Sequence, residues 1–364
     1  MVTIEKAKAR LDLIIAKGRV DLYKPIQIAE VLRHSRLEGA IDIRDEETYR
    51  NLSVHWRDDV TDRLVVKLST SSARYQHDVW NKNAMPPEIL AVLDTENKRT
   101  KGAVERYIYM RYAERQETVA NIVALIEVAT PKNFRLETLL NLFVIQKGIR
   151  RSVDKAYEIV AHSLFETVVV ALEATVKVSV PDTSKGLLAE FADLARVLLG
   201  LQEGEIHWEQ PAHVYRVGVT NAADRGLDMW ANFGPAIQVK HLTLNERRAN
   251  AIVDQIESDH VVIVCRDADA NAIRAITKQI GWGRRVRGIV RESDLIGWYE
   301  RCLRGKFADR LAKPLLRELL SEFEAEFPQA KSIGGFLVER GYAASTPHKL
   351  WHTKSDAIVA TDKK

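Results

Sequence analysis

The chain has 364 residues, 46% of them hydrophobic and 29% charged, which are the proportions of an ordinary globular protein with room for two domains. No apolar run approaches the ~20 residues of a membrane helix, and the charged N-terminus lacks a signal-peptide core, so we expect a cytoplasmic protein without a membrane span. Two cysteines are too few for a disulfide framework or a cysteine-based zinc site. A net charge of +4 is compatible with a nucleic-acid partner without requiring one.

The first 180 residues are predicted to be mainly helical. Pro25 can begin a helix, and apolar residues recur at three- and four-residue spacing in the stretches 102–129, 133–149 and 152–176. Between these helices, residues 69–87 (STSSARYQHDVWNKNAMPP) have the composition of a loop with many hydrogen-bonding side chains. We therefore expect residues 1–180 to form one mainly helical region.

Helices and strands alternate after Pro181. Leu187, Phe191, Leu194 and Leu198 form the apolar stripe of a first helix. Counting this helix as the first element, the predicted order is α-β-β-β-α-β-α-β-α. The strands are expected at 213–219, 226–231, 236–244, 260–266 and 285–290, and the later helices at 245–258, 268–280 and 293–303. This order predicts an α/β (α+β) core over residues 181–305, in which helices flank a mixed central sheet, and a helical extension over residues 306–364.

The polar residues of one predicted hairpin carry the chemistry. Strand periodicity puts Gln238 and Lys240 on the same face of their strand, and Asp228 on the neighbouring strand can lie opposite them. A carboxylate, a side-chain carbonyl and an ammonium then converge, which is the set that hydrolysis of a phosphodiester needs. Asp228, the Gln238 amide oxygen and the Val239 carbonyl oxygen would hold Mg²⁺, a hard cation that takes oxygen ligands. Lys240 would hold the attacking water and stabilise the developing negative charge.

Further candidates surround this set, each with a simpler structural explanation beside it. Glu190 borders the apolar stripe of the preceding helix, and we expect it to supply a further ligand or an outer contact. Asp224 fits a second metal ligand or, preferably, a turn residue. His241 should point to the opposite face from Lys240. Glu203 and Glu205 fit either further ligands of the metal or solvated loop residues, with nothing to favour one over the other, and Trp230 and Trp282 are expected in the core.

The residues also resemble known families. G-L-D followed by I-Q-V-K-H (residues 226–228 and 237–241) is similar to the D…QxK variant of the PD-(D/E)XK nuclease core found in Mrr-type restriction proteins. Together with DLYKPIQIAEVLRHSR, WRDDV, the 69–87 passage and GLDMWANFGPAIQVKH, it resembles the HaeII family of type II restriction endonucleases over most of the chain. Gln238 stands where the commoner pattern has Glu, which removes one negative charge from the metal site.

This resemblance implies fold, substrate and partners. It implies a PD-(D/E)XK core, double-stranded DNA as the substrate, Mg²⁺ as the cofactor, the palindrome purine-GCGC-pyrimidine as the target, and a cognate DNA methyltransferase. Because twofold DNA is most simply matched by a twofold protein, we expect a homodimer, with residues 1–180 serving recognition and dimerisation and the contact within 102–176.

Two groups of side chains suit contacts with DNA. Arg74, Gln76, Asn81 and Asn83 are of the types that read guanine and adenine edges in the major groove, and they are also ordinary loop residues. Arg284, Arg285 and Arg287, with Arg291 close by, form either a phosphate-binding patch or a solvated face.

Three functions remain open at this point. The leading one is a site-specific restriction endonuclease. The second is a nuclease of the same core that serves modification-dependent restriction or DNA repair, and the third is a DNA-binding protein with an inactive core. Discrete bands from unmodified plasmid would favour the first over the second, and metal-dependent cleavage would exclude the third.

Overall fold

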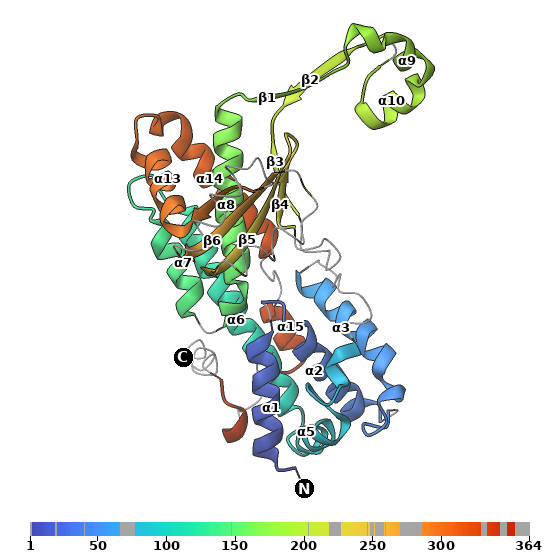
Figure 1. Cartoon of the computed structure of the whole chain (residues 1–364). Coiled ribbons are helices and arrows are strands. Elements are labelled where there is room, and N and C mark those ends of the chain that lie inside the picture. The colour runs from blue at the N-terminus through green and yellow to red at the C-terminus, as the bar shows by residue number, and fades with distance from the viewer. Residues whose placement is uncertain are drawn as a thin grey trace.

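Figure 1 shows a computed structural model of the chain, with helices gathered around a five-stranded sheet and a long arm leading away from it. The structure describes residues 2–18, 20–39, 41–65, 77–146, 148–202, 204–217, 227–245, 247, 251, 258, 260–269, 286–328, 333–342 and 348–353. Within these ranges, no helix combines the length and the apolar character that crossing a bilayer requires.

One hydrophobic core lies among the N-terminal helices. It joins α1 (Ile4–Lys17), α2 (Tyr23–Leu37), α3 (Arg50–Val65), α5 (Pro87–Arg99) and the first half of α6 (Ala103–Glu127), with the short 3-10 turns η1 (Glu46–Thr48) and η2 (His77–Trp80). The C-terminal α15 (Ile333–Glu339) and η5 (Lys349–Trp351) pack into the same core through Phe336 and Trp351. Two segments at opposite ends of the chain therefore form one helical body.

A second and larger core lies beneath the sheet. It is formed by the second half of α6, α7 (Leu136–Ile145), η3 (Arg150–Ser152), α8 (Val153–Ala171), α13 (Glu292–Arg304) and α14 (Ala308–Glu326). Helix α14 shows why these helices bury one side in the core. Its Leu315, Leu319 and Phe323 recur at four-residue spacing and are fully buried, while charged residues occupy its outer face. Helix α8, which the sequence groups with the first 180 residues, thus packs on the sheet, and α7 packs against α8 and α13.

The sheet has the strand order β3-β4-β5-β6-β7 and mixes two kinds of pairing. Strands β3 (Val214–Arg216), β4 (Met229–Ala231) and β5 (Pro235–Leu244) are antiparallel neighbours, whereas β5, β6 (His260–Ala268) and β7 (Val286–Arg291) run parallel. Ile237, Val239 and Val264 face the large core, and Ala236, Val261 and Ile263 belong to a smaller cluster on the other side of the sheet. The expected mixed sheet with packed helices is confirmed, although the expected helices 245–258 and 268–280 lie almost wholly outside the described residues.

Two expectations for residues 152–198 are wrong. The helix expected over 152–176 ends at Ala171, and Thr175–Ser179 forms β1, because Glu173 takes a left-handed conformation (φ 54°) and the β-branched Thr175, Val176 and Val178 favour an extended chain. The single helix expected on the sheet is instead divided between α9 (Lys185–Glu190) and α10 (Ala192–Leu199), which follow η4 (Asp182–Ser184) at the far end of an arm. Strand β2 (His207–Pro211) returns along β1 to the body.

Candidate active site

The β4–β5 hairpin brings the predicted site residues together. Gly234 turns the chain between the strands with φ 115°, a conformation that other residues rarely adopt, and its N–H donates to the Ala231 carbonyl oxygen (2.9 Å). This turn sets the register in which Met229 pairs with Ile237 and Trp230 with Ala236. One residue further along the same register, Asp228 lies opposite Gln238, as the strand pattern predicts.

Asp228 and Gln238 are in direct contact. The Gln238 side-chain amide and the Val239 backbone N–H (2.7 Å) both donate to Asp228 Oδ2. Gln238 is only 3% exposed, so its amide is held in place and cannot exchange this partner freely for water. Burial raises the pKa of Asp228 above its usual range, and the Val239 N–H and the Lys240 charge partly offset the rise.

Lys240 is the exposed member of the set. It pairs with Cys265 of β6, and the regular register of β5 with β6 breaks directly after it, between Lys240 and Thr243. Such irregularities re-aim the neighbouring side chains of a strand. The ammonium is therefore open to solvent and to a substrate, although its charge still acts on the half-buried Asp228.

The first turn of α8 is tied to the same end of β5. Asp154 Oδ1 accepts the His241 backbone N–H (3.4 Å) and contacts His241 Nδ1. Burial acts to raise the pKa of Asp154, but the hydrogen bond and charge of His241 outweigh it, so the pKa lies below its usual range. His241 is thus a link between strand and helix.

Glu158, one turn further along α8, is an acidic residue that sequence reasoning missed. It is 4% exposed, and Lys155 Nζ lies 2.5 Å from its Oε2. Burial raises the pKa of Glu158 to about 7; Lys155 opposes this rise, and the negative charge of Asp228 adds to it. The available signal was an acid four residues after Asp154 on the inward side of an apolar helix, but that helix was assigned to another region.

The donor set suits a hard divalent cation. Asp228, directly before β4, and Glu158 of α8 offer carboxylate oxygens, and Gln238 and Val239 of β5 offer an amide and a backbone carbonyl oxygen. Mg²⁺ prefers oxygen ligands of these kinds. The carboxylates of the half-buried Asp228 and the buried Glu158 each have a pKa raised by burial. The positive charges of Lys155 and Lys240 do not fully offset this rise, so the site favours a further positive charge.

Glu190 does not join this group. It is exposed at the end of α9, at the far end of the arm and away from β4 and β5 (Figure 1). Glu205 closes a turn at the same end by accepting the Gln202 N–H (3.2 Å). The expected core position of Trp230 is wrong, since it is 44% exposed and stacks on Tyr215 with ring centroids 4.6 Å apart. The other candidates, Asp224, Glu203 and Trp282, lie outside the described residues.

The candidate DNA-contacting residues are described only in part. Asn81 and Asn83 form a turn after η2, in which the Asn83 N–H donates to Asn81 Oδ1 (2.8 Å). Arg10 of α1 donates to the neighbouring Lys82 and Ala84 carbonyl oxygens (2.9 and 2.7 Å), which fixes this loop to the helical body. Arg287 lies in β7 with its side chain outside the description, as are Arg74, Gln76, Arg284 and Arg285 entirely.

Comparisons with known proteins place this chain among restriction enzymes. The sequence model of the family described as HaeII restriction endonuclease matches residues 7–342. The chain is 44% identical over 344 residues to the type II restriction enzyme HaeII of Haemophilus aegyptius, covering 94% of this chain and 98% of the relative. It is 45% identical over 347 residues to the type II restriction enzyme NgoBI of Neisseria gonorrhoeae, with the same coverage of 94% and 98%. No solved structure matches the chain.

Proposed function

The chain belongs to the HaeII restriction endonuclease family, and on that premise we propose that Asp228, Gln238 and Lys240 form the site with which it cuts duplex DNA. The resemblance read from the sequence is thereby confirmed, and the protein is a type II restriction endonuclease, a site-specific deoxyribonuclease. The observation that carries the proposed site is the convergence of Gln238 and the Val239 N–H on the Asp228 carboxylate, beside an exposed lysine.

We propose that four residues hold Mg²⁺: Asp228, Gln238, Val239 and Glu158. The ion, when bound, neutralises charge on the scissile phosphate and lowers the pKa of a bound water. Glu158 takes the part that the sequence alone assigns to Glu190, because it is buried and within reach of the negative charge of Asp228, whereas Glu190 is remote. It also restores the negative charge that Gln238, in place of Glu, removes from the site.

Lys240 has a separate role in this proposal. Its exposed ammonium orients the attacking water and stabilises the negative charge that develops on the phosphate oxygens. Gln238 cannot act as a general acid or base, so it serves to position other groups. Its side-chain amide N–H holds the Asp228 carboxylate, and its amide oxygen lies at a fixed place. Asp154 and His241 keep α8 against β5, which fixes the distance between the Glu158 backbone and the strand.

Several finer features belong to the same proposal. They are a PD-(D/E)XK core over residues 181–305 extended by α8, recognition by residues 1–180, the target purine-GCGC-pyrimidine, a homodimer, a cognate DNA methyltransferase and a cytoplasmic location. The β3-β4-β5 antiparallel strands followed by parallel β6 and β7, with the site at the hairpin, support the core assignment. The family membership supports the rest.

One digestion tests the function. Unmodified plasmid DNA of known sequence, carrying purine-GCGC-pyrimidine sites, is incubated with the protein in Mg²⁺ and the ends are mapped. We expect discrete fragments that end at those sites, no cleavage in EDTA, and protection of DNA methylated within the site. Discrete fragments ending elsewhere would overturn the target, and cleavage that persists in EDTA would overturn the metal site.

A further inference from the structure

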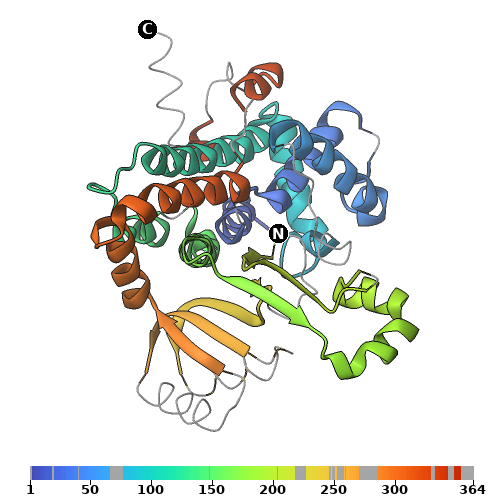
Figure 2. The ribbon, with the colours of Figure 1, turned by 90° about the horizontal axis from the view of Figure 1, so that it is seen from above.

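The arm formed by residues 174–211 leads away from the rest of the molecule in both views (Figures 1 and 2). Its shaft is a two-stranded ribbon in which β1 pairs antiparallel with β2, from Thr175 with Pro211 to Ser179 with His207, and no strand in the described part of the chain pairs with it as a third. Its end carries α9 and α10, of only six and eight residues. Isolated ribbons and helices of this length have little stability of their own in water.

The arm also lacks a core. Among its described residues only Ala195 and Leu201 are buried. The apolar stripe that the sequence predicts on the inward side of a helix is exposed instead: Leu187 is 62% exposed, Leu194 53% and Leu198 74%. Phe191 and Val197 widen the same surface, at 47% and 82% exposure. A contiguous apolar surface at the end of an extension marks a place of contact with another protein surface.

Charge argues against DNA as the occupant of this surface. Residues 174–211 contain six acidic side chains and three basic ones, within a chain whose net charge is +4. Glu190 and Asp193 lie at the end of α9 and the start of α10, next to the apolar stripe. Phosphates would be repelled there, whereas the body of the same protein carries the compensating positive excess.

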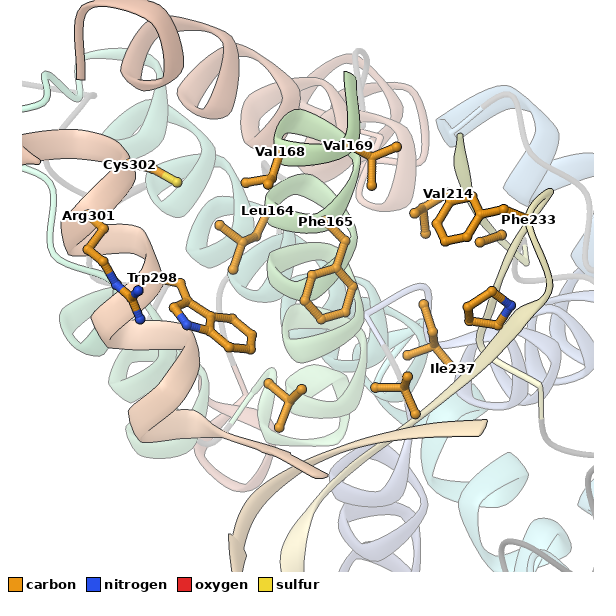
Figure 3. A pocket seen from close by; sticks show the side chains of 14 residues that line it. Leu164, Phe165, Val168, Val169, Val214, Phe233, Ile237, Trp298, Arg301 and Cys302 are labelled. Atoms are coloured by element: carbon orange, nitrogen blue, oxygen red, sulfur yellow. The ribbon is translucent and has the colours of Figure 1, made fainter. Parts of the chain in front are cut away.

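A complementary surface lies at the base of the arm. A cavity of about 520 Å³ opens between α8, α13 and the sheet (Figure 3). Its lining is made largely of apolar side chains, among them Leu164, Phe165, Val168, Phe233 and Trp298, with Arg301 at one side. The apolar lining suits leucine and phenylalanine side chains, and Arg301 suits the acids beside them.

We propose that α9 and α10 of each protomer seat in this cavity of a second copy of the chain. The arm leaves the body a few residues after Val168 and Val169, which line the cavity, so base and cavity adjoin. If the arms of two protomers cross at their midpoints about a twofold axis, the α9–α10 end of each arm reaches the cavity of the other protomer. The twofold axis then repeats the same contact in both directions. This inference rests on the homodimer of the proposed function and moves its contact from residues 102–176 to the arm.

Sedimentation equilibrium of the full-length protein tests the arm. The variant Leu194→Asp with Leu198→Asp changes only exposed positions, so we expect a wild-type fold by circular dichroism and a dimer dissociation constant raised by at least about 100-fold. The matched control is Leu125→Asp with Val128→Asp, two apolar residues that are 56% and 68% exposed in and beside α6, and it should remain dimeric. A variant that stays as dimeric as the wild type overturns the arm contact.

Cross-linking between different chains tests the cavity. A tagged Leu194→Cys protein is mixed with an untagged Phe233→Cys protein, both carrying Cys302→Ala so that the native thiol of the cavity lining is absent, and oxidised gently; Phe233 lines the cavity and is 39% exposed. We expect a disulfide-linked pair of unequal chains. Links that form only between two Leu194→Cys chains overturn the proposal that each arm seats in the cavity of the other protomer. So does a chain carrying both substitutions that forms the disulfide only within itself. Because mapped cleavage by the wild type is scored separately, failure of the arm contact leaves the nuclease function standing.

Discussion

Lys240 and Asp228 divide the work of the site according to their exposure. Lys240 is an exposed residue of β5, whereas Asp228 is half-buried with its carboxylate fixed by Gln238 and Val239. A fixed carboxylate suits a metal ligand, because its geometry costs no further ordering when the ion binds. An exposed ammonium suits the transition state, since it can follow the charge that develops on the phosphate.

Lys240→Ala should abolish cleavage while leaving specific DNA binding within about threefold of wild type, because the ammonium acts in the transition state rather than on the bound duplex. The loss of rate should be on the order of 100-fold or more, the scale of removing one such donor. Single-turnover cleavage and filter binding on the same duplex measure the two effects. Near-normal cleavage by a folded Lys240→Ala protein would remove this residue from the mechanism.

Glu158→Gln should also be inactive, because it removes a carboxylate from the proposed Mg²⁺ site while keeping the shape of the side chain. Its control is Glu190→Gln, the same substitution at the far end of the arm, which should cut at the wild-type rate. Raising Mg²⁺ should recover part of the activity of Glu158→Gln, as expected for weakened metal affinity. If instead Glu190→Gln lost cleavage activity and Glu158→Gln kept it, Glu190 would be the further metal ligand, as the sequence alone predicts.

The buried Glu158 carboxyl also makes stability depend on pH. Burial raises its pKa to about 7 from the ordinary 4.5, so the unfolded chain loses this proton first as pH rises. Stability that is present below pH 4.5 is then lost as the pH rises to about 7, on the order of 3 kcal/mol for a shift of this size. In EDTA, the melting temperature of Glu158→Gln should therefore exceed that of wild type more at pH 8 than at pH 5. An equal difference at both pH values would argue against a buried, titrating carboxyl.

Helix α8 is the element on which site and interface both depend. Its first turns carry Asp154 and Glu158, its middle packs in the large core, and its last turns line the cavity at the base of the arm. Helix α14 packs along it, and Arg216 of β3 donates to Glu322 and Glu326 of α14 (2.6 Å each). A rigid α8 thus couples the position of the carboxylates to the packing beneath the sheet.

That packing can be tested with two phenylalanines at the two ends of α14. Phe323 is fully buried against Phe143 and Phe327, so Phe323→Ala should lower the free energy of unfolding by about 3–5 kcal/mol. Phe307, which precedes the helix and is 61% exposed, provides the matched control, and Phe307→Ala should cost less than about 1 kcal/mol. Urea denaturation measures both. Equal losses in the two variants would mean that α14 is not packed as described.

At the scale of the whole molecule, the two hydrophobic cores assign different tasks to different parts of the chain. The helical body holds the Asn81–Asn83 loop, and the larger core holds the sheet, the site and the base of the arm. Helix α6 runs through both cores, so a continuous helix would link the proposed recognition region to the proposed site. If the target is a palindrome, as we propose, cutting both of its strands would need two such units.

Calcium should separate binding from cutting. It fits the same oxygen ligands but holds them more loosely than Mg²⁺, so it should support specific binding without efficient cleavage. In Ca²⁺, sedimentation of the protein with a 20-mer duplex should give two protomers on one duplex, and transfer to Mg²⁺ should cut both strands. One protomer that cuts both strands, or rapid cleavage in Ca²⁺ alone, would contradict this expectation.

The sequence by itself determined most of the elements and the meeting of Asp228 with Gln238 in the hairpin. Asp228, Gln238 and Lys240 could be read from strand periodicity and the Gly234 turn, because a hairpin fixes by local geometry which residues lie opposite one another. Most helices could be read from apolar spacing for the same reason: α2, α6 and α13 lie where the pattern puts them.

Only the tertiary structure decided which distant residues meet. It brought Glu158 to Asp228 across seventy positions of sequence, placed the last helix in the N-terminal core, and exposed the stripe of Leu187, Leu194 and Leu198. An apolar stripe shows that a surface will be covered but not by what, since burial is non-directional and any apolar surface satisfies it. Long-range contacts depend on the packing of whole elements, and no local pattern in this chain specified them.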